Sequence, residues 1–415
     1  MYTVCRYVCQ SCLRTAAPLA RRSHSTLVSP KSLTFSSFFF HNGYWNTPSK
    51  APTPLPVPSN RRRIAQALPV GSASIANYKP TESLTPRRLL KVYAQLSKSR
   101  LTTLVVLTAM SGVALSPLPA TVPVLLATAL GTTLCSASAN TLNQIQEVPL
   151  DAQMTRTRNR PLVRRAISPV HAAGFALVTG VAGPAILWTM VNPVTAILGV
   201  ANIALYAGAY TYLKRTSIVN TWVGAVVGAI PPLMGWTACG GHLLPSSSYP
   251  IHTFLPSFLS DVPIDLAWID NPLAAFALFM LLYSWQFPHF NALSHLLRGS
   301  YAQAGYHMLS TLSPSKNALV SLRHSLLLIP ICSVLVPLSG LTTWAFALTS
   351  LVPNVVCTQA AWTFWRSTGE KEARKLFYHC LWYLPVILGL MMFHKQGVDW
   401  LSWVGWKQDE ERESA

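Results

Sequence analysis

The feature that most constrains this chain is the absence of charge over long stretches. Six tracts contain no Asp, Glu, Lys or Arg, and they cover residues 101–146, 166–213, 216–260, 271–297, 324–365 and 376–394. One membrane-crossing helix needs about 20 consecutive apolar residues. Only 11% of the residues are charged and 51% are hydrophobic, whereas a soluble domain typically has about 25% charged residues. The sequence therefore predicts an all-α, polytopic membrane protein and excludes a soluble globular enzyme.

The lengths of these tracts predict nine crossings. Three tracts are long enough for two helices each, and we divide them at 117–123, at 192–193 and at 339–342. The resulting helices cover residues 101–119, 122–145, 169–190, 194–213, 219–239, 271–293, 321–339, 342–364 and 376–393. Loop charge supports this number, because Lys and Arg gather on the side that is not translocated. Nineteen basic residues fall on one side of the predicted bundle, and three fall on the other, all in the C-terminal tail.

The first 81 residues differ from the rest of the chain. They contain ten Lys or Arg and no acidic residue, and they are rich in Ser, Arg and Pro. This composition is typical of an organellar transit sequence. We therefore predict a mitochondrial transit segment (1–81), an amphipathic segment along the membrane surface (82–100), a nine-helix transmembrane domain (101–393) and a C-terminal tail (394–415).

These segments predict a location and an orientation. The protein would lie in the mitochondrial inner membrane, with the basic loops facing the matrix and the C-terminus in the intermembrane space. A basic arm that binds nucleic acid would share the charge of residues 1–81. Because a hydrophobic body follows that arm, we predict the lipid bilayer as a partner and no nucleic acid.

Polar side chains end the second predicted crossing. They form a polar ladder of Asn140, Asn143, Glu147 and Asp151, at spacings of three, four and four residues. This spacing places Asn140, Asn143 and Glu147 on one face of a helix, and Asp151 follows just past Pro149. Carboxylate and amide oxygens at this spacing suit Mg2+, which binds through one or two carboxylates together with ligand phosphates. The alternative is a polar helix end that reaches the membrane surface. We predict a metal site formed by Asn143, Glu147 and Asp151.

Cationic side chains follow this ladder and recur in the next basic loop. Arg156 and Arg160 come first, and Lys214 and Arg215 follow Tyr210 after the fourth predicted crossing. Guanidinium groups match phosphate oxygens with two parallel hydrogen bonds. The tendency of positively charged loops to stay on the side that is not translocated explains these cations, but it does not explain the polar ladder. A metal site beside cations indicates a diphosphate substrate.

These motifs resemble the UbiA-type intramembrane prenyltransferases. The pattern Asn143-x3-Glu147-x3-Asp151 is similar to the first aspartate-rich motif of that family. The Arg-Thr-x2-Arg-Pro-Leu that begins at Arg156 is similar to the protoheme IX farnesyltransferase (haem O synthase) branch. Further blocks that resemble this branch cover residues 210–214, 230–236 and 285–293. The likeness runs from about residue 90 to 395.

The resemblance implies a fold and a reaction. The fold is a nine-helix UbiA-like bundle whose motif loops cap one end. In the reaction, farnesyl diphosphate, haem B and water give haem O and diphosphate, for haem A biosynthesis and cytochrome c oxidase assembly. Mg2+ is then the cofactor and haem B a substrate. The resemblance leaves a homo-oligomer and a haem-modifying partner open.

It also implies roles for individual residues. Breaking the allylic carbon–oxygen bond forms a delocalised cation and a diphosphate anion, so a metal and fixed cations lower the barrier. The residues implied as catalytic are Asp151, Glu147, Lys214 and His289. Those implied to bind diphosphate or haem are Asn140, Asn143, Arg156, Arg160, Arg215, Tyr210 and Asn291. His289 would orient haem, ligate its iron or handle a proton.

One position departs from the family pattern. The branch usually has an acidic residue where this chain has Ser300, just before Tyr301. Ser300 cannot supply a carboxylate to a second metal site. This leaves open whether one Mg2+ suffices, whether His295 or Asn291 compensates, or whether activity is reduced. Two alternatives stay open: a related prenyltransferase with an aromatic or quinone-precursor acceptor, and a non-catalytic membrane carrier or assembly factor.

Overall fold

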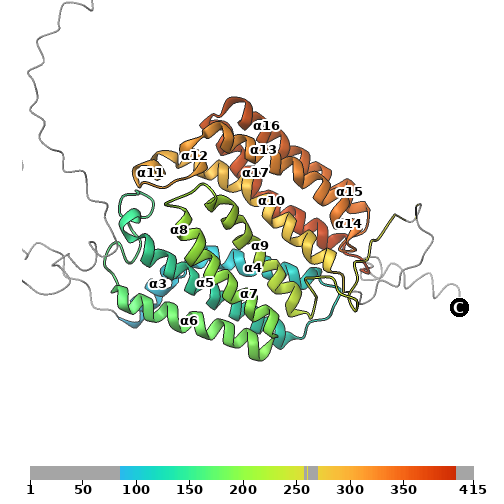
Figure 1. Ribbon diagram of the computed structural model, residues 1–415, viewed down its shortest axis with the longest axis horizontal. Helices are drawn as coiled ribbons and strands as arrows, with labels where there is room; N and C mark the ends of the chain where they lie inside the picture. The colour runs from blue at the N-terminus through green and yellow to red at the C-terminus, as the bar shows by residue number, and fades with distance from the viewer. Residues whose placement is uncertain (1–84, 257–258, 260–269, 399–415) are drawn as a thin grey trace, which may run out of the picture. The chain divides into compact units, whose positions relative to one another are not determined.

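A computed structural model describes residues 85–256, 259 and 270–398, and these residues are arranged almost entirely as helices (Figure 1). The predicted transit segment and most of the predicted C-terminal tail lie outside the described residues. In chain order the helices are α3 (Pro86–Leu96), α4 (Ser99–Leu115), α5 (Val122–Asp151), α6 (Pro169–Met190), α7 (Pro193–Ile203), η4 (Ala204–Tyr210), α8 (Thr211–Leu213), α9 (Asn220–Ala238), α10 (Pro272–Leu296), α11 (Arg298–Gln303), α12 (Leu309–Leu312), α13 (Pro314–Pro330), η5 (Ile331–Leu335), α14 (Val336–Leu338), α15 (Ala345–Thr349), α16 (Leu351–Ser367) and α17 (Glu370–Phe393).

Every predicted crossing corresponds to a helical segment, so the prediction of an all-α membrane fold is confirmed. The third prediction, 169–190, has the same bounds as α6. The fourth and seventh crossings are composite, because a π-helical stretch interrupts each: η4 in one and η5 in the other. Among the described helical segments, six are long and apolar enough to cross a membrane: 122–151, 169–190, 193–213, 272–296, 314–338 and 370–393. The number nine therefore stays a prediction.

A two-residue signal begins four of these helices. Each starts with Pro, whose missing N–H has no helical partner at this position and whose φ is already helical. The residue before each Pro is Ser or Asn, and its side-chain oxygen accepts a hydrogen bond from a backbone N–H of the first turn. The pairs are Ser168-Pro169, Asn192-Pro193, Asn271-Pro272 and Ser313-Pro314. Helix starts are therefore encoded locally.

The long helices pack in two groups that meet along one seam. Helices α4, α5, α6, α7 and α9 form the first group, and α10, α13, α16 and α17 form the second. Contacts of α9 with α10 and of α4 with α17 join them (Figure 1). Helices α4 and α9 lie so close that a Cβ on Gly112 would stand 2.1 Å from the Pro232 carbonyl oxygen. A Cβ on Gly235 would stand 1.9 Å from the Ala109 carbonyl oxygen.

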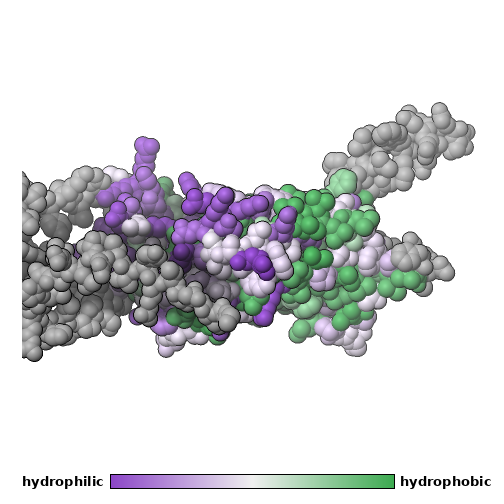
Figure 2. Space-filling model, turned by 90° about the horizontal axis from the view of Figure 1, so that it is seen from above, coloured by the Kyte–Doolittle hydropathy of each residue, from purple (hydrophilic) through white to green (hydrophobic). Residues whose placement is uncertain are grey.

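Polar and apolar surfaces separate along the bundle. Figure 2 shows hydrophilic residues gathered toward one end of the visible face and hydrophobic residues over the rest. Many large apolar side chains are exposed, among them Leu177, Val170 and Val352, which are 68%, 82% and 69% exposed. Such surface is unfavourable in water but matches the hydrocarbon of a bilayer. The polar end contains the loops that carry the predicted site.

The α4–α9 contact gives a first test. Replacing Gly112 with Ala should destabilise the protein by about 1–3 kcal/mol, because the added methyl group forces two backbones apart. Gly174→Ala is the matched control, since a Cβ there meets no atom within 4 Å. The measurement is the melting temperature of the detergent-purified protein. A melting temperature for Gly112→Ala as high as that of the control would contradict the close packing.

Candidate active site

The polar ladder lies at the end of α5, and the helix is longer than predicted. The expected end at residue 145 is wrong by six residues, since α5 continues through Pro149 to Asp151. Proline at this position removes one helical hydrogen bond and its ring crowds the carbonyl of the residue four positions earlier, yet the helix continues for two residues beyond it. Asn143, Glu147 and Asp151 thus recur every four residues on one face. These three residues are buried, with at most 2% of each residue exposed.

Two basic loops supply partners for the two carboxylates. The Lys214 ammonium donates to Glu147 Oε1 at 2.8 Å. The Arg160 guanidinium pairs with Asp151 and also lies 3.7 Å from Glu147 Oε2. Both cations come from loops that follow α5 and α8, as the sequence predicted. Breaking a buried ion pair leaves an uncompensated charge, so these pairs fix the loops against the helix end.

A third cation was missed by sequence reasoning. Lys98 connects α3 to α4 with a positive φ of 48°. Its ammonium donates to Asn143 Oδ1 at 2.9 Å and to the Tyr206 hydroxyl at 3.2 Å. The Asn143 amide in turn donates to Thr211 Oγ1 at 3.0 Å. In the sequence Lys98 is one of several loop cations, and no local signal separates it from its exposed neighbours.

Aromatic rings cover the cations. A spacing of four residues along η4 and α8 relates Tyr206 to Tyr210 and Tyr210 to Lys214. The sequence therefore contained this spacing as a signal for Tyr206. The Lys214 ammonium lies 4.5 Å from the Tyr210 ring centroid and 5.9 Å from that of Tyr306. The Tyr206 and Tyr210 rings stack at 5.4 Å. Stretches of π-helix frequently occur at functional sites, and η4 brings both rings to this one.

The loop between α10 and α13 closes over the same cluster. Tyr301, Tyr306 and Met308 pack against Met154 in a small hydrophobic core. The His307 N–H donates to the Lys214 carbonyl at 2.8 Å. Ser300 lies in α11 of this loop, which brings no carboxylate to the cluster. Within the described part of the chain, no group of three or more His, Cys, Asp or Glu gathers at one point.

Charge at this cluster is unbalanced. Three cations (Lys98, Arg160 and Lys214) face two carboxylates, so the enclosed groups sum to +1 when all are ionised. Burial lowers the pKa of Lys98, which lies outside the predicted crossings, to about 7, and the neighbouring Arg160 adds to this effect. Burial alone would also lower the pKa of Arg160, but Asp151 and Glu147 raise it above its ordinary value. An anion bound here would relieve the excess positive charge.

The donor set fits one Mg2+ ion. Glu147, Asp151 and the Asn143 amide offer oxygen atoms of the kind that Mg2+ binds, all on one helical face. Mg2+ is usually bound by one or two carboxylates plus substrate phosphates, and it retains several waters. Two carboxylates could bind the ion while the three cations bind the substrate phosphates. This arrangement matches a Mg2+ site that is completed by substrate better than one built from protein ligands alone.

Other predicted residues lie elsewhere. Arg156 and Arg215 are exposed on the surrounding loops. The Asn140 amide donates to the Ser97 carbonyl at 3.2 Å, at the α3–α4 link. Asn291 and Asn317 exchange hydrogen bonds that join α10 to α13. The contacts of these residues do not place them in the ion cluster.

His289 faces the second group of helices. Its ring stacks on Trp285 at 5.0 Å and on Phe377 of α17 at 4.9 Å. The Trp285 indole N–H donates to the Cys380 carbonyl at 3.0 Å, which fixes that ring. The His289 Nδ1 atom is buried and has no hydrogen-bond partner among the described residues. The structure does not bring this imidazole into contact with Glu147 or Asp151.

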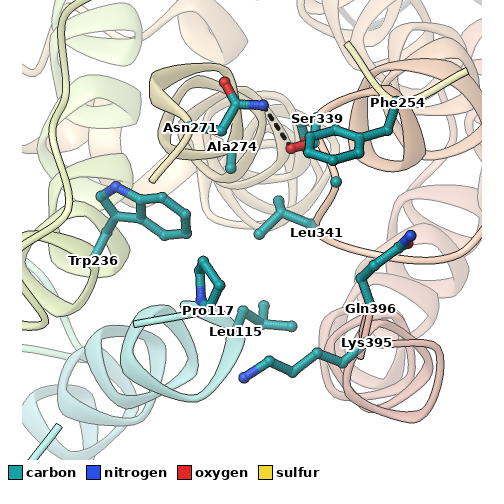
Figure 3. Close-up of a pocket in the computed structure, with 11 residues that line it drawn as sticks. Leu115, Pro117, Trp236, Phe254, Asn271, Ala274, Ser339, Leu341, Lys395 and Gln396 are labelled. Carbon is teal, nitrogen blue, oxygen red and sulfur yellow. Dashed lines mark hydrogen bonds between the residues drawn. The ribbon is translucent and has the colours of Figure 1, made fainter. Parts of the chain in front are cut away.

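A hollow at the other end of the bundle is unrelated to this cluster. It measures about 30 Å³ and is bordered by Trp236, Asn271, Ser339 and Lys395 among others (Figure 3). The Asn271 amide donates to the Ser339 carbonyl at 2.9 Å, and Lys395 donates to the Ser116 carbonyl at 2.8 Å. These bonds join helix ends, so the hollow is a structural gap.

Comparison with known proteins defines the class. The model of the UbiA prenyltransferase family matches residues 104–382, and the chain belongs to this family. A curated relative from Neurospora crassa, named "Protoheme IX farnesyltransferase, mitochondrial", is 43% identical over 383 residues, which cover 87% of this chain and 72% of the relative. A protein of the same name from Yarrowia lipolytica is 45% identical over 337 residues, covering 78% of this chain and 65% of the relative.

A solved structure shows the same fold. It comes from work on a digeranylgeranylglyceryl phosphate synthase and is 14% identical to this chain, with a TM-score of 0.55. The match covers 74% of this chain and 98% of that one. The UbiA-like bundle predicted from the motifs is therefore confirmed.

The ion cluster gives a second test. Lys214→Met should destabilise the protein by about 3–5 kcal/mol, because Glu147 then stays buried without its closest cation. Arg215→Met is the control: that exposed side chain should contribute less than about 0.5 kcal/mol. The measurement is the shift in melting temperature in detergent. Equal melting temperatures for the two variants would show that the Lys214–Glu147 pair does not hold the loop.

Proposed function

We propose that this protein transfers the farnesyl group of farnesyl diphosphate to a vinyl group of haem B, with addition of water, to give haem O and diphosphate. The observation that carries this is the buried cluster of two carboxylates and three cations at the end of an apolar bundle. It lies in a chain that is 43% and 45% identical to two curated protoheme IX farnesyltransferases.

The diphosphate would bind where the cations converge. Lys98, Arg160 and Lys214 come from three separate segments, and each already contacts a ladder residue. Arg160 offers a planar fork to two phosphate oxygens, whereas the lysines act as point charges. When the substrate enters, its phosphate oxygens take over part of the role that the carboxylates now fill. We assign the exposed Arg156 and Arg215 to the approach of the diphosphate, since both lie on the same loops.

The protein lowers the barrier by stabilising charge that develops during ionisation. As the allylic carbon–oxygen bond breaks, the electron pair moves to the leaving diphosphate, and the fixed cations stabilise it. The remaining allylic cation is close to the Tyr206 and Tyr210 rings, whose faces attract positive charge in a site without water. The apolar helices α4, α5, α7 and α9 surround the hydrocarbon chain.

Mg2+ would be held by Asn143, Glu147 and Asp151. When bound, the ion supplies positive charge that neutralises the diphosphate oxygens. Because Ser300 provides no carboxylate, the described residues fit a single ion. Lys98 and Lys214 would supply positive charge in place of a second metal ion.

His289 is our candidate for contact with haem. The imidazole is sandwiched between Trp285 and Phe377, so its orientation is fixed. A neutral imidazole nitrogen without a hydrogen-bond partner suits an iron ligand. Asn291, two residues further along α10, supports this segment by bonding to Asn317.

The proposal includes a location. The curated relatives are named as mitochondrial, and the apolar helices indicate a multi-pass membrane protein. We propose the inner membrane, with the ion cluster and basic loops on the matrix side, the C-terminus in the intermembrane space, and a haem-modifying partner that takes the product.

Arg160 gives the direct test of the site. Arg160→Ala should lower haem O formation by about 100-fold or more, because a charge-assisted contact to the leaving group is lost. The assay uses full-length protein in nanodiscs with haem B, farnesyl diphosphate and Mg2+, and products are identified by mass. Arg158→Ala is the control, since this exposed neighbour lies outside the cluster. Arg160→Lys, which keeps the charge, separates loss of the fork from misfolding.

Metal removal gives another test. Chelation of divalent ions should abolish haem O formation, and added Mg2+ should restore it. Asp151→Asn should require a higher Mg2+ concentration or remain inactive, because one oxygen ligand loses its charge. Full activity of wild-type protein in excess chelator would remove the metal from the proposal. Formation of a prenylated aromatic compound, with no haem adduct, would instead identify a different acceptor.

A further inference from the structure

The rings around His289 leave one of its nitrogens open to a ligand. Helices α10 and α17 pack side by side (Figure 1), and Trp285, His289 and Phe377 each keep part of their surface exposed. The Nδ1 atom of His289 is buried, whereas Nε2 keeps exposed surface, and neither atom has a hydrogen-bond partner among the described residues. A ligand can therefore reach this imidazole beside the contact of α10 with α17.

This imidazole lies toward the basic end of the bundle. His289 is seven residues from the end of α10 at Leu296, and Phe377 is seven residues from the start of α17 at Glu370. Seven helical residues span about 10 Å. The Arg298 guanidinium lies 3.0 Å from Glu370 Oε1 and joins the two helix ends. The loop that begins with this arginine closes over the ion cluster, so the nearest surface to His289 is the basic one.

Arg374 is the cation that shares a face of α17 with Phe377. It precedes Phe377 by three residues, which makes the two side chains neighbours on the helix surface. It lies about 4.5 Å closer to the basic end along the helix axis, and it is exposed. Lys375 is exposed as well, but it lies about 160° around the helix from Phe377.

The carboxylates near Arg374 are already engaged. Glu370 pairs with Arg298. The Glu372 carboxylate folds back over the start of α17, into the space that a side chain on Gly369 would take. Among the described residues, no carboxylate lies within ion-pair distance of Arg374. Its guanidinium is therefore available to an anion from outside the chain.

We propose that Arg374 binds a propionate of the haem acceptor while His289 faces the iron. This inference rests on the proposed function and names the residue that holds the anionic edge of that substrate. Haem B carries two propionates on one half of its ring and its vinyl groups on the other half. A carboxylate is very unfavourable in hydrocarbon, and a guanidinium matches it with two parallel hydrogen bonds. With the propionates at Arg374, the vinyl groups point away from the surface and into the apolar interior.

Surface cations also have a general role, which the test must separate from this contact. Positive charge keeps a loop on its side of the membrane and attracts lipid phosphates. Lys375 lies in the same turn as Arg374 and carries the same charge, but it faces away from Phe377. A general effect of charge would therefore appear at both positions, whereas a propionate contact requires Arg374.

A binding titration tests the contact without turnover. Full-length protein in nanodiscs is titrated with haem B and with its dimethyl ester, whose propionates are uncharged, and the Soret band is followed after subtraction of empty nanodiscs. Arg374→Gln should lower the preference for haem B over the ester about tenfold, because a hydrogen bond between charged groups is lost. The preference is a ratio measured in one lipid, so the partitioning of the two porphyrins into the bilayer cancels between variants.

Two further variants make the titration specific. Lys375→Gln is the matched control, and it should keep the wild-type preference to within about twofold. Arg374→Lys keeps the charge but not the planar fork, and its preference should fall between those of wild-type protein and Arg374→Gln.

Turnover shows whether the contact serves the reaction. Arg374→Gln should raise the KM for haem about tenfold, with a smaller effect on kcat and no change in the KM for farnesyl diphosphate. Loss of a contact made equally in the ground state and the transition state has this signature. A KM raised for both substrates, together with a lowered melting temperature, would indicate a structural role and overturn the proposal.

The outcomes separate this inference from the proposed function. An equal preference in wild-type protein and Arg374→Gln would overturn the contact, and so would an equal loss in Lys375→Gln. Haem O formation with an unchanged KM for haem in Arg374→Gln would overturn this inference alone. If wild-type protein forms no haem O, the proposed function fails, and the titration still decides whether Arg374 binds the propionates. A wild-type protein that gives no Soret change would overturn both.

Discussion

The rest of this site depends on two carboxylates buried at the end of one helix. Glu147 and Asp151 lie against apolar helices, where an isolated charge is very unfavourable. Each is therefore paired, and the partners come from segments far apart in the chain: Arg160 after α5 and Lys214 after α8. The loop before α13 then bonds to the Lys214 backbone. One helix end thus organises three loops, and the same groups that hold these loops are those suited to bind a metal and a diphosphate.

Much of this was encoded locally and could be predicted. Uncharged tracts and Ser-Pro or Asn-Pro pairs mark the helices, which is why the bounds of α6 agree with the prediction. Helical spacing also predicted that Asn143 and Glu147 share one face, whereas Asp151 was expected just past Pro149 and is in fact the last residue of α5. Arg160 was linked to the same site by its chemistry and not by helical geometry, because a guanidinium group that follows metal-binding carboxylates in the sequence matches the oxygens of a phosphate.

Long-range placement could not be predicted in the same way. Lys98 reaches Asn143 only because a positive φ turns the chain between α3 and α4, and the sequence gives no sign of that turn. Helix α5 passes Pro149 because nearby ion pairs hold its last turn, a tertiary effect. His289 was expected with the catalytic residues on the basis of resemblance, whereas its contacts are with Trp285 and Phe377. Which face of α10 it occupies depends on how the two helix groups meet.

The position of Lys98 also shows how much of the chain the site requires. Helix α3 and Lys98 precede the first long membrane helix, yet the Lys98 ammonium is part of the ion cluster, and the Gln95 side chain accepts a hydrogen bond from Arg164. Helix α3 and the link that follows it are therefore part of the site although they precede the long helices. Loss of residues 86–98 would leave those helices in place but remove Lys98 and the Gln95 contact to Arg164, so a correctly inserted bundle alone would not be a complete enzyme.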